Sequence, residues 1–147
     1  MRVQGGALVA EGTKQTEELL KMKGKILVIN PGSTSTKIAM YSDGKQLWSE
    51  SIEHSPEEVK KIGDAYAQID WRSGLVVDTA KAKGESLSDL AAVVSRGGPF
   101  APVRSGAYEV NADMLHVMRT RPQDKHVSII GMEIAQQIAG PLGIKAY

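Results

Sequence analysis

Short apolar runs, separated by polar turns, divide the chain into predicted strands. The first run is apolar at nearly every position and rich in β-branched residues, which is typical of a strand buried on both faces. The next two runs alternate more, and the Asp-Gly pair at 43–44 between them is typical of a hairpin turn. The predicted strands are KILVIN (25–30), STKIAMYS (35–42), KQLWSESIE (45–53) and LAAVVS (90–95).

Helical spacing of apolar residues follows these strands. Ser55 has the pattern of an N-cap, with Pro56 at the first helical position and Glu58 completing a capping box, and the apolar face of this helix extends to Tyr66. A break is predicted in QIDWRSG (68–74), before a second helix that ends at Gly84. Two more helices are predicted, one opened by Asn111 and Asp113, the other beginning after His126 and ending at Gly140-Pro141.

The order of these elements, β-β-β-α-α-β-α-α with a further strand beginning in IKAY (144–147), predicts an α/β domain. The initial three-stranded meander is antiparallel, so the sheet is predicted to be mixed. Residues 1–22 lack a strong period and are expected to be a flexible N-terminal tail or a short surface helix, which leaves 23–147 as the folded domain. A natural start at Met22 is an alternative for this end of the chain.

Charge and composition narrow the classes of partner. Lys and Arg number 18 against 17 Asp and Glu, giving a net charge of +1, so neither nucleic acid nor an anionic membrane surface is expected as a partner. The chain has no cysteine, which excludes disulfides and thiolate chemistry. No run approaches the roughly 20 apolar residues of a membrane span, and a cytoplasmic protein acting on small molecules is expected.

The polar turn after the first strand, NPGSTSTK (30–37), carries candidate ligand-binding groups. Its amide, hydroxyl and ammonium groups could surround phosphate oxygens, although the P-loop pattern is absent and a strand, not a helix, follows. The candidate residues are Asn30, Gly32, Ser33, Ser35 and Lys37. The alternative is a hairpin turn in which these residues serve backbone conformation alone.

Two further polar positions follow buried segments. Arg96 ends the fourth strand and is followed by Gly97 and Gly98; arginine there could bind a carboxylate or phosphate, since ligands of open α/β sheets bind at the carboxyl ends of strands. His126 precedes a helix and could donate a hydrogen bond to an anion. The alternatives are that Arg96 is an ordinary surface arginine and that His126 is a solvated helix cap. The three histidines are widely separated, so no metal site is predicted from them.

Taken together, these motifs resemble those of the acetate and butyrate kinase family. ILVINPGSTSTKIAMY (26–41) is similar to the family's N-terminal signature of an apolar strand, Asn, one residue, Gly-Ser, two hydroxyl residues, one residue and Lys. AVVSRGGPFAPVRSGAYEVN (92–111) resembles its second region in the form nearer to butyrate kinase, and DKHVSIIG (124–131) resembles its histidine loop. The resemblance extends from about residue 23 to the C-terminus.

The resemblance implies a ribonuclease-H-like fold of the actin-like ATPase superfamily. It also implies phosphoryl transfer between ATP and butyrate, giving butyryl phosphate and ADP with Mg²⁺ as cofactor. Asn30, Gly32, Ser33, Ser35 and Lys37 would line the phosphate site, and Arg96 and His126 would be catalytic, with Gly97 and Gly98 in the substrate loop.

The family resemblance also raises the question of completeness. Family members carry a second similar domain and usually form homo-oligomers, so this chain is expected to be the N-terminal half of a cleft and inactive in isolation. The alternatives are a non-catalytic or partner-dependent module that binds phosphate or carboxylate, and another kinase of the superfamily, such as a sugar kinase.

Overall fold

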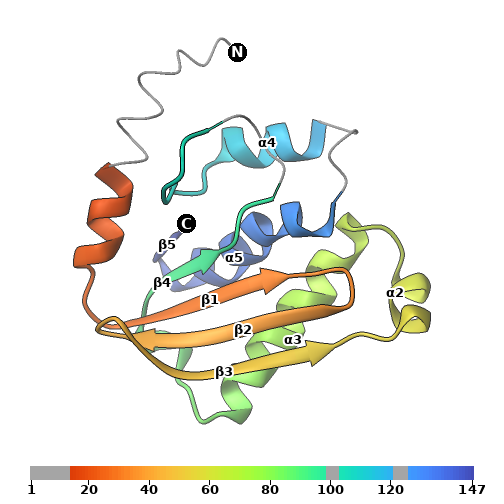
Figure 1. The fold of residues 1–147 in the computed structure, drawn as a ribbon, viewed down its shortest axis with the longest axis horizontal. Helices are drawn as coiled ribbons and strands as arrows, with labels where there is room; N and C mark the ends of the chain where they lie inside the picture. Colours follow the sequence, from red (N-terminus) through yellow and green to blue (C-terminus); the bar gives the residue numbers. More distant parts are fainter. Residues whose placement is uncertain (1–13, 99–102, 121–125) are drawn as a thin grey trace.

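The apolar run that begins at Lys25 forms the centre of a five-stranded mixed sheet with the order β3-β2-β1-β4-β5 (Figure 1). A computed structural model describes residues 14–98, 103–120 and 126–147. β1 pairs antiparallel with β2 and parallel with β4, and β4 pairs parallel with β5. The strands are β1 (Lys25–Pro31), β2 (Ser35–Ser42), β3 (Lys45–Glu53), β4 (Leu90–Ser95) and β5 (Lys145–Ala146). The predicted mixed α/β sheet is confirmed.

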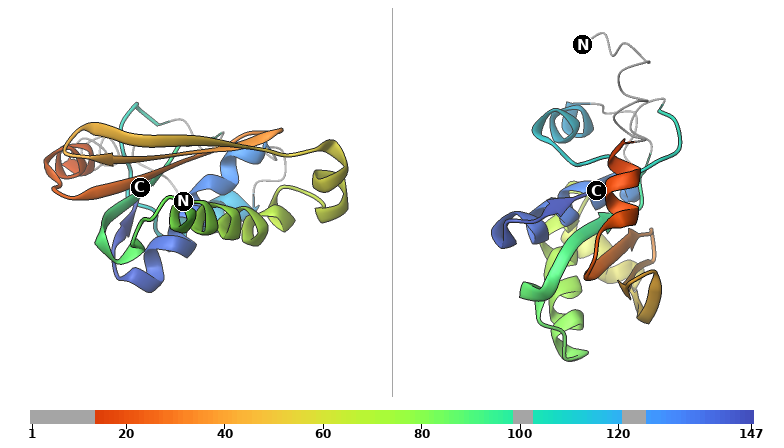
Figure 2. Two further views of the ribbon diagram at one scale, coloured as in Figure 1. Left: turned by 90° about the horizontal axis from the view of Figure 1, so that it is seen from below. Right: turned by 90° about the vertical axis from the view of Figure 1, so that its left-hand side faces the viewer.

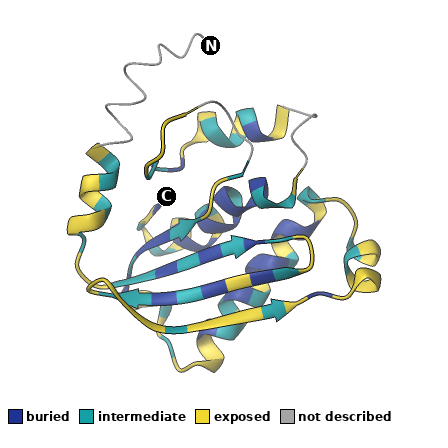
Figure 3. Ribbon diagram, viewed as in Figure 1, coloured by how far each residue is buried: buried dark blue, intermediate teal, exposed yellow. Residues whose placement is uncertain are grey.

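Register gives the two faces of the sheet different surroundings. Leu27 lies opposite Met40 and Ile29 opposite Ile38, and all four side chains are buried. The alternate positions, among them Val28 and Ala39, point to the other face and are only partly buried. One face of the sheet therefore faces the core, and the other stays more open in the described part of the chain. Figure 3 shows the resulting change of burial class from residue to residue along the strands.

Helices α3 and α5 cover the buried face, and Figure 2 shows them on the same side of the strands. The α-helices after the meander are α2 (Pro56–Ile62), α3 (Ile69–Ala82), α4 (Ala112–Thr120) and α5 (Gly131–Ala139). The short 3-10 helices are η1 (Tyr66–Gln68), η2 (Leu87–Asp89), η3 (Val127–Ile130) and η4 (Gly140–Leu142).

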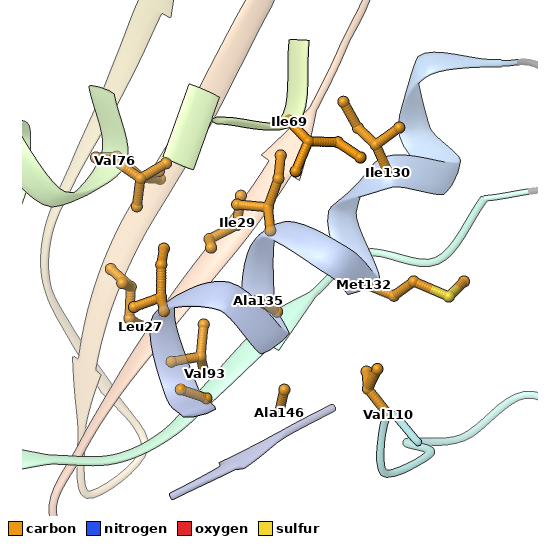
Figure 4. Close-up of a cluster of buried hydrophobic side chains, with 14 of the residues drawn as sticks. Leu27, Ile29, Ile69, Val76, Val93, Val110, Ile130, Met132, Ala135 and Ala146 are labelled. Atoms are coloured by element: carbon orange, nitrogen blue, oxygen red, sulfur yellow. The ribbon is translucent and has the colours of Figure 1, made fainter. Parts of the chain in front are cut away.

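The hydrophobic core lies between the sheet and these two helices (Figure 4). Leu27 and Ile29 of β1 and Val93 of β4 pack there with Val76 of α3 and Ala135 of α5. Each of these side chains is fully buried, and complete burial of a Leu, Ile or Val contributes about 1.5–3 kcal/mol relative to exposure. This core holds the carboxyl ends of β1 and β4 next to the start of α5.

Local sequence signals are confirmed at several places. The Ser55 hydroxyl accepts a hydrogen bond from the Glu58 N–H, and the Glu58 carboxylate accepts one from the Ser55 N–H, which completes the predicted capping box. Asp43 and Gly44 both have positive φ, at 50° and 76°, as the two central residues of a type I′ hairpin require. The Asn111 side chain accepts from the Met114 N–H at the start of α4.

Three predicted helix boundaries are wrong. α2 ends at Ile62 because Gly63 adopts a φ of 120°, so Tyr66 belongs to η1. The predicted break at 68–74 is absent: η1 leads directly into α3, which begins at Ile69. The segment after His126 is a 3-10 helix followed by α5 and not one continuous α-helix.

The segment preceding β1 contains a helix over residues 14–21. Its Gln15 and Thr16 side chains accept hydrogen bonds from the N–H groups of Glu109 and Ala107, at 2.6 and 2.7 Å. Residues 14–21 therefore follow the helical alternative for this end of the chain, and residues 1–13 lie outside the described residues. In the described ranges, no helix combines the length and the apolar character that crossing a membrane requires.

Candidate functional site

The loop joining β1 to β2 is closed by a hydrogen bond from the Gly32 N–H to the Ser35 carbonyl, at 2.7 Å. The side chains of Ser33 and Thr34 are exposed at its tip. The Thr34 carbonyl accepts from the His54 N–H at 2.8 Å, so the end of β3 supports the loop as well. The result is a strand-turn-strand loop, as predicted, that presents hydroxyl groups at the carboxyl end of β1. Phosphate binding by this loop stays a prediction.

Asn30 and Lys37 flank the loop as register partners on the open face of the sheet. Both line a shallow hollow of about 200 Å³, whose other walls include Val28, Ser49 and Ser51. Lys37 is exposed and Asn30 is half-buried. One residue with an amide and one with an ammonium group therefore occupy paired positions next to the loop.

Arg96 follows the end of β4, beside the end of β1. Its N–H donates to the Ile29 carbonyl at 2.9 Å, which continues the β1–β4 pairing by one residue. Its side chain is exposed. Arg96 thus stands at the carboxyl edge of the sheet, where the sequence predicts it.

Gly98 is where the loop after β4 touches the start of η3. A Cβ atom added to Gly98 would lie 2.6 Å from both the Ile129 nitrogen and the Ser128 Oγ, closer than real Cβ contacts allow. The same test at Gly97 finds open space. Of these two glycines, therefore, Gly98 is the one that close packing requires, and this packing brings the Arg96 segment to the His126 segment.

His126 is the N-cap of η3. Its Nδ1 accepts from the Ser128 N–H at 3.2 Å and lies 2.7 Å from the Ser128 hydroxyl. Because Nδ1 is the acceptor for the backbone N–H, the neutral ring carries its proton on Nε2. The exposed imidazole can therefore donate from Nε2 to a ligand.

Gly131, the first residue of α5, joins the three segments. A Cβ atom there would lie 2.0 Å from the Ser95 Oγ, 3.2 Å from the Pro31 ring and 3.3 Å from the Arg96 carbonyl. The ends of β1 and β4 and the start of α5 therefore meet at one point. The sequence alone does not single out this glycine, because the three segments are distant in sequence and no local pattern marks their meeting point.

The sequence alone also does not reveal a buried polar cluster under the β1–β2 loop. It consists of Thr36, His54, Gln68 and Arg72, all buried. The His54 Nε2 lies 2.7 Å from the Thr36 hydroxyl, and its ring packs on Trp71 with centroids 4.6 Å apart. Burial, followed by the nearby charge of Arg72, lowers the pKa of His54. The buried stripe of α3 runs through positions 69, 72, 73, 76 and 80, and finding it from the sequence requires the helix to begin at Ile69, inside the segment predicted as a break.

The donors at this edge of the sheet suit an anion. Hydroxyl groups, the exposed Lys37 and Arg96, and the His126 imidazole can all donate to phosphate or carboxylate oxygens. Among the described residues, no group of three or more His, Asp or Glu side chains could hold a metal ion. The donor set therefore fits the phosphates of a nucleotide but does not by itself form a magnesium site.

Comparison with known proteins finds relatives whose sequences align with most of this chain. No family model matches. Butyrate kinase 1 of Clostridium acetobutylicum is 40% identical over 123 residues, which are 84% of this chain and 35% of that protein. Butyrate kinase 2 of the same organism is 40% identical over 126 residues, 86% of this chain and 35% of that protein. Among solved structures, an acetate kinase from Entamoeba histolytica matches with a TM-score of 0.56 and 13% identity, over 84% of this chain and 35% of its own.

The strand order is that of the predicted mixed α/β domain, and the likeness to a solved acetate kinase shows that this chain shares its fold with part of that protein. The identity with butyrate kinases confirms the resemblance to the acetate and butyrate kinase family over most of the chain. The chain spans about a third of the length of these relatives.

Proposed function

We propose that this chain contributes one wall of the active-site cleft of a butyrate kinase, which transfers a phosphoryl group between ATP and a short-chain carboxylate. The observation that carries the proposal is the convergence of the β1–β2 loop, the Arg96 segment and the His126 segment on Gly131 and Gly98. The relatives named butyrate kinase support the choice of reaction.

The reaction needs no protein nucleophile. A carboxylate oxygen of butyrate attacks the γ-phosphorus of ATP, and the bond from that phosphorus to the β-phosphate oxygen breaks, which yields butyryl phosphate and ADP. Catalysis of such a transfer rests on positioning and on stabilising charge that spreads over the transferring oxygens. Magnesium, when bound with the nucleotide, neutralises part of the phosphate charge.

Each candidate residue has a role in this scheme that matches its chemistry. The loop residues Gly32, Ser33 and Ser35 supply N–H and hydroxyl donors to phosphate oxygens, with Asn30 and Lys37 beside them. Arg96 offers a planar fork to the carboxylate or to the transferring phosphoryl group. His126 donates from Nε2 to the same group. Gly97 leaves the backbone beside Arg96 open to a ligand, and Gly98 holds the Arg96 segment against the His126 segment.

The test is an assay of acyl phosphate formation by the product of the complete gene, with butyrate, isobutyrate and acetate as acceptors. Arg96→Ala should lower kcat/KM on the order of 10²–10³-fold, the loss that follows removal of one preorganised donor. Lys45→Ala, which removes an exposed cation at the start of β3, is the control and should leave kcat/KM within about twofold. Absence of acyl phosphate with every acid would reject the proposal, and equal losses in the two variants would reject the role of Arg96.

A second candidate is a binding module without turnover of its own, supported by the exposed donors Ser33, Lys37 and Arg96. In this case the 147-residue chain should bind inorganic phosphate or butyryl phosphate in a titration followed by NMR, with shifts at Gly32–Ser35 and at His126. It should form no acyl phosphate alone. Turnover by the chain alone would exclude this candidate.

A further inference from the structure

Arg72 is the most deeply buried charged side chain described in the structure. It lies on the face of α3 that packs against the sheet, and it is 0% exposed. No carboxylate of residues 14–98, 103–120 or 126–147 forms an ion pair with it. Burial lowers the pKa of Arg72 to about 10, so the guanidinium remains protonated at neutral pH. The structure thus contains a buried positive charge whose described partners are all neutral.

The guanidinium is held from one side by a side-chain amide. The Nε and Nη2 groups both donate to the Gln68 Oε1, at 3.1 and 2.8 Å. Gln68 in turn donates from its Nε2 to the Gly63 carbonyl at 3.1 Å, which fixes the amide orientation. Gln68 and Arg72 are about one helical turn apart, so a contact within the same part of the chain orients the guanidinium toward the sheet.

The other side of the Arg72 guanidinium donates hydrogen bonds to the β1–β2 loop and the start of β2. Arg72 Nη1 donates to the Ser35 carbonyl at 3.1 Å and to the Thr36 hydroxyl at 2.9 Å. The Ser35 carbonyl is the same acceptor that closes the loop by receiving the Gly32 N–H. The Thr36 hydroxyl also meets the His54 ring. The Ser35 carbonyl therefore accepts two hydrogen bonds, one from the Gly32 N–H that closes the loop and one from the buried Arg72 guanidinium.

Burying a charge without an ionic partner costs folding free energy unless other interactions compensate for it. Replacing buried ionic groups by apolar residues of similar volume is often neutral or stabilising, so packing alone does not account for an arginine here. A cation beneath polar donors raises the positive potential at the loop tip, and the low-dielectric interior screens it little. The exposed Ser33 and Thr34 lie at that tip.

We propose that Arg72 is a positioning residue for the β1–β2 loop, which fixes the Ser35 carbonyl from beneath and supplies an unpaired charge that attracts a phosphate anion to the loop. The anion part rests on the proposed function, whereas the support of the loop does not depend on any ligand.

The test compares Arg72→Lys and Arg72→Met with Lys81→Met, which removes an exposed charge from the same helix. Two quantities are measured on the 147-residue chain: hydrogen exchange of the Gly32 N–H without ligand, and the Kd for inorganic phosphate from amide shifts of residues 32–35. Arg72→Met should raise Kd about tenfold and speed exchange at Gly32. Arg72→Lys retains the charge but not the fork, so it should speed exchange while raising Kd less. Lys81→Met should change neither.

The outcomes separate the two parts of the proposal. Unchanged Gly32 exchange in Arg72→Lys would overturn the positioning role, and this variant decides the matter if Arg72→Met does not fold. Equal phosphate Kd in folded Arg72→Met and in the parent chain would overturn the role of the charge. If the parent chain binds no phosphate at all, the proposed phosphate site on this chain is rejected, while faster Gly32 exchange in Arg72→Lys would still support the positioning role.

Discussion

His54 shows how one buried side chain can make the stability of this protein depend on pH. Burial and the neighbouring Arg72 charge favour the neutral ring and lower its pKa, and Glu58 and Glu53 oppose this only in part. The unfolded chain therefore takes up a proton at higher pH than the folded chain does. It follows that the contribution of neutral His54 to the free energy of unfolding is complete above about pH 6.5 and is lost as the pH falls below that value.

We expect His54→Gln, which cannot titrate, to weaken this acid dependence. The difference in the free energy of unfolding between pH 7 and pH 5, measured by urea denaturation, should be smaller in the variant than in the parent chain. His116→Gln removes an exposed histidine of α4 and is the control. The same pH dependence in His54→Gln and the parent chain would show that His54 titrates freely in the folded protein.

At the scale of elements, the loop after β4 and helix η3 depend on one close backbone contact. Gly98 packs directly on the Ile129 nitrogen, and this contact sets the spacing between the Arg96 and His126 segments. Neighbouring Gly97 faces open space. The two adjacent glycines therefore offer a matched pair for testing whether packing at this junction matters.

Gly98→Ala should lower the free energy of unfolding by about 1–3 kcal/mol, because the added methyl group forces the loop and η3 apart. Gly97→Ala should change it by no more than about 0.5 kcal/mol. Urea denaturation of both variants measures the difference, and NMR shifts at Ser128 and Ile129 report the local displacement. Two variants of equal stability would mean that the loop relaxes without strain.

At the scale of the whole molecule, the two ends of the sheet have different roles. The carboxyl ends of β1 and β4 carry the candidate site. At the opposite end, the Glu85 carboxylate accepts from Lys25 of β1 at 2.6 Å and from the Trp48 indole of β3 at 2.8 Å. The Lys25 hydrogen bond, followed by that of Trp48, lowers the pKa of Glu85. The segment after α3 is thereby tied to the strands at their far end.

Glu85→Gln should lower stability at pH 7 without changing phosphate affinity. The depressed pKa of Glu85 means that its contribution is present above about pH 4.5 and is lost as the pH falls, so the variant should also lose less stability on acidification. Glu50→Gln, which breaks the more exposed pair with Lys83, is the control and should have a smaller effect. A higher Kd for phosphate in Glu85→Gln than in the parent chain would show that the two ends of the sheet are coupled.

Sequence by itself determined the strands, several local turn and cap signals, and the outward-facing candidates. Apolar periodicity predicted β1 to β4, and the Asp43-Gly44 turn, the capping box at Ser55 and the placement of Arg96 at a strand end follow from local rules. These features could be predicted because each depends on neighbours within a few residues.

Only the tertiary structure decided which of these groups meet and what supports them. Arg72 and Ser35 are 37 residues apart, and Gly131 meets Ser95 and Pro31 through the packing of α5 against β4 and β1. An arginine in the buried stripe of α3 is indistinguishable in sequence from one at a helix surface when the helix boundary is predicted wrongly. The physical reason is that contacts between distant segments follow from sheet order and core packing, which no local pattern encodes.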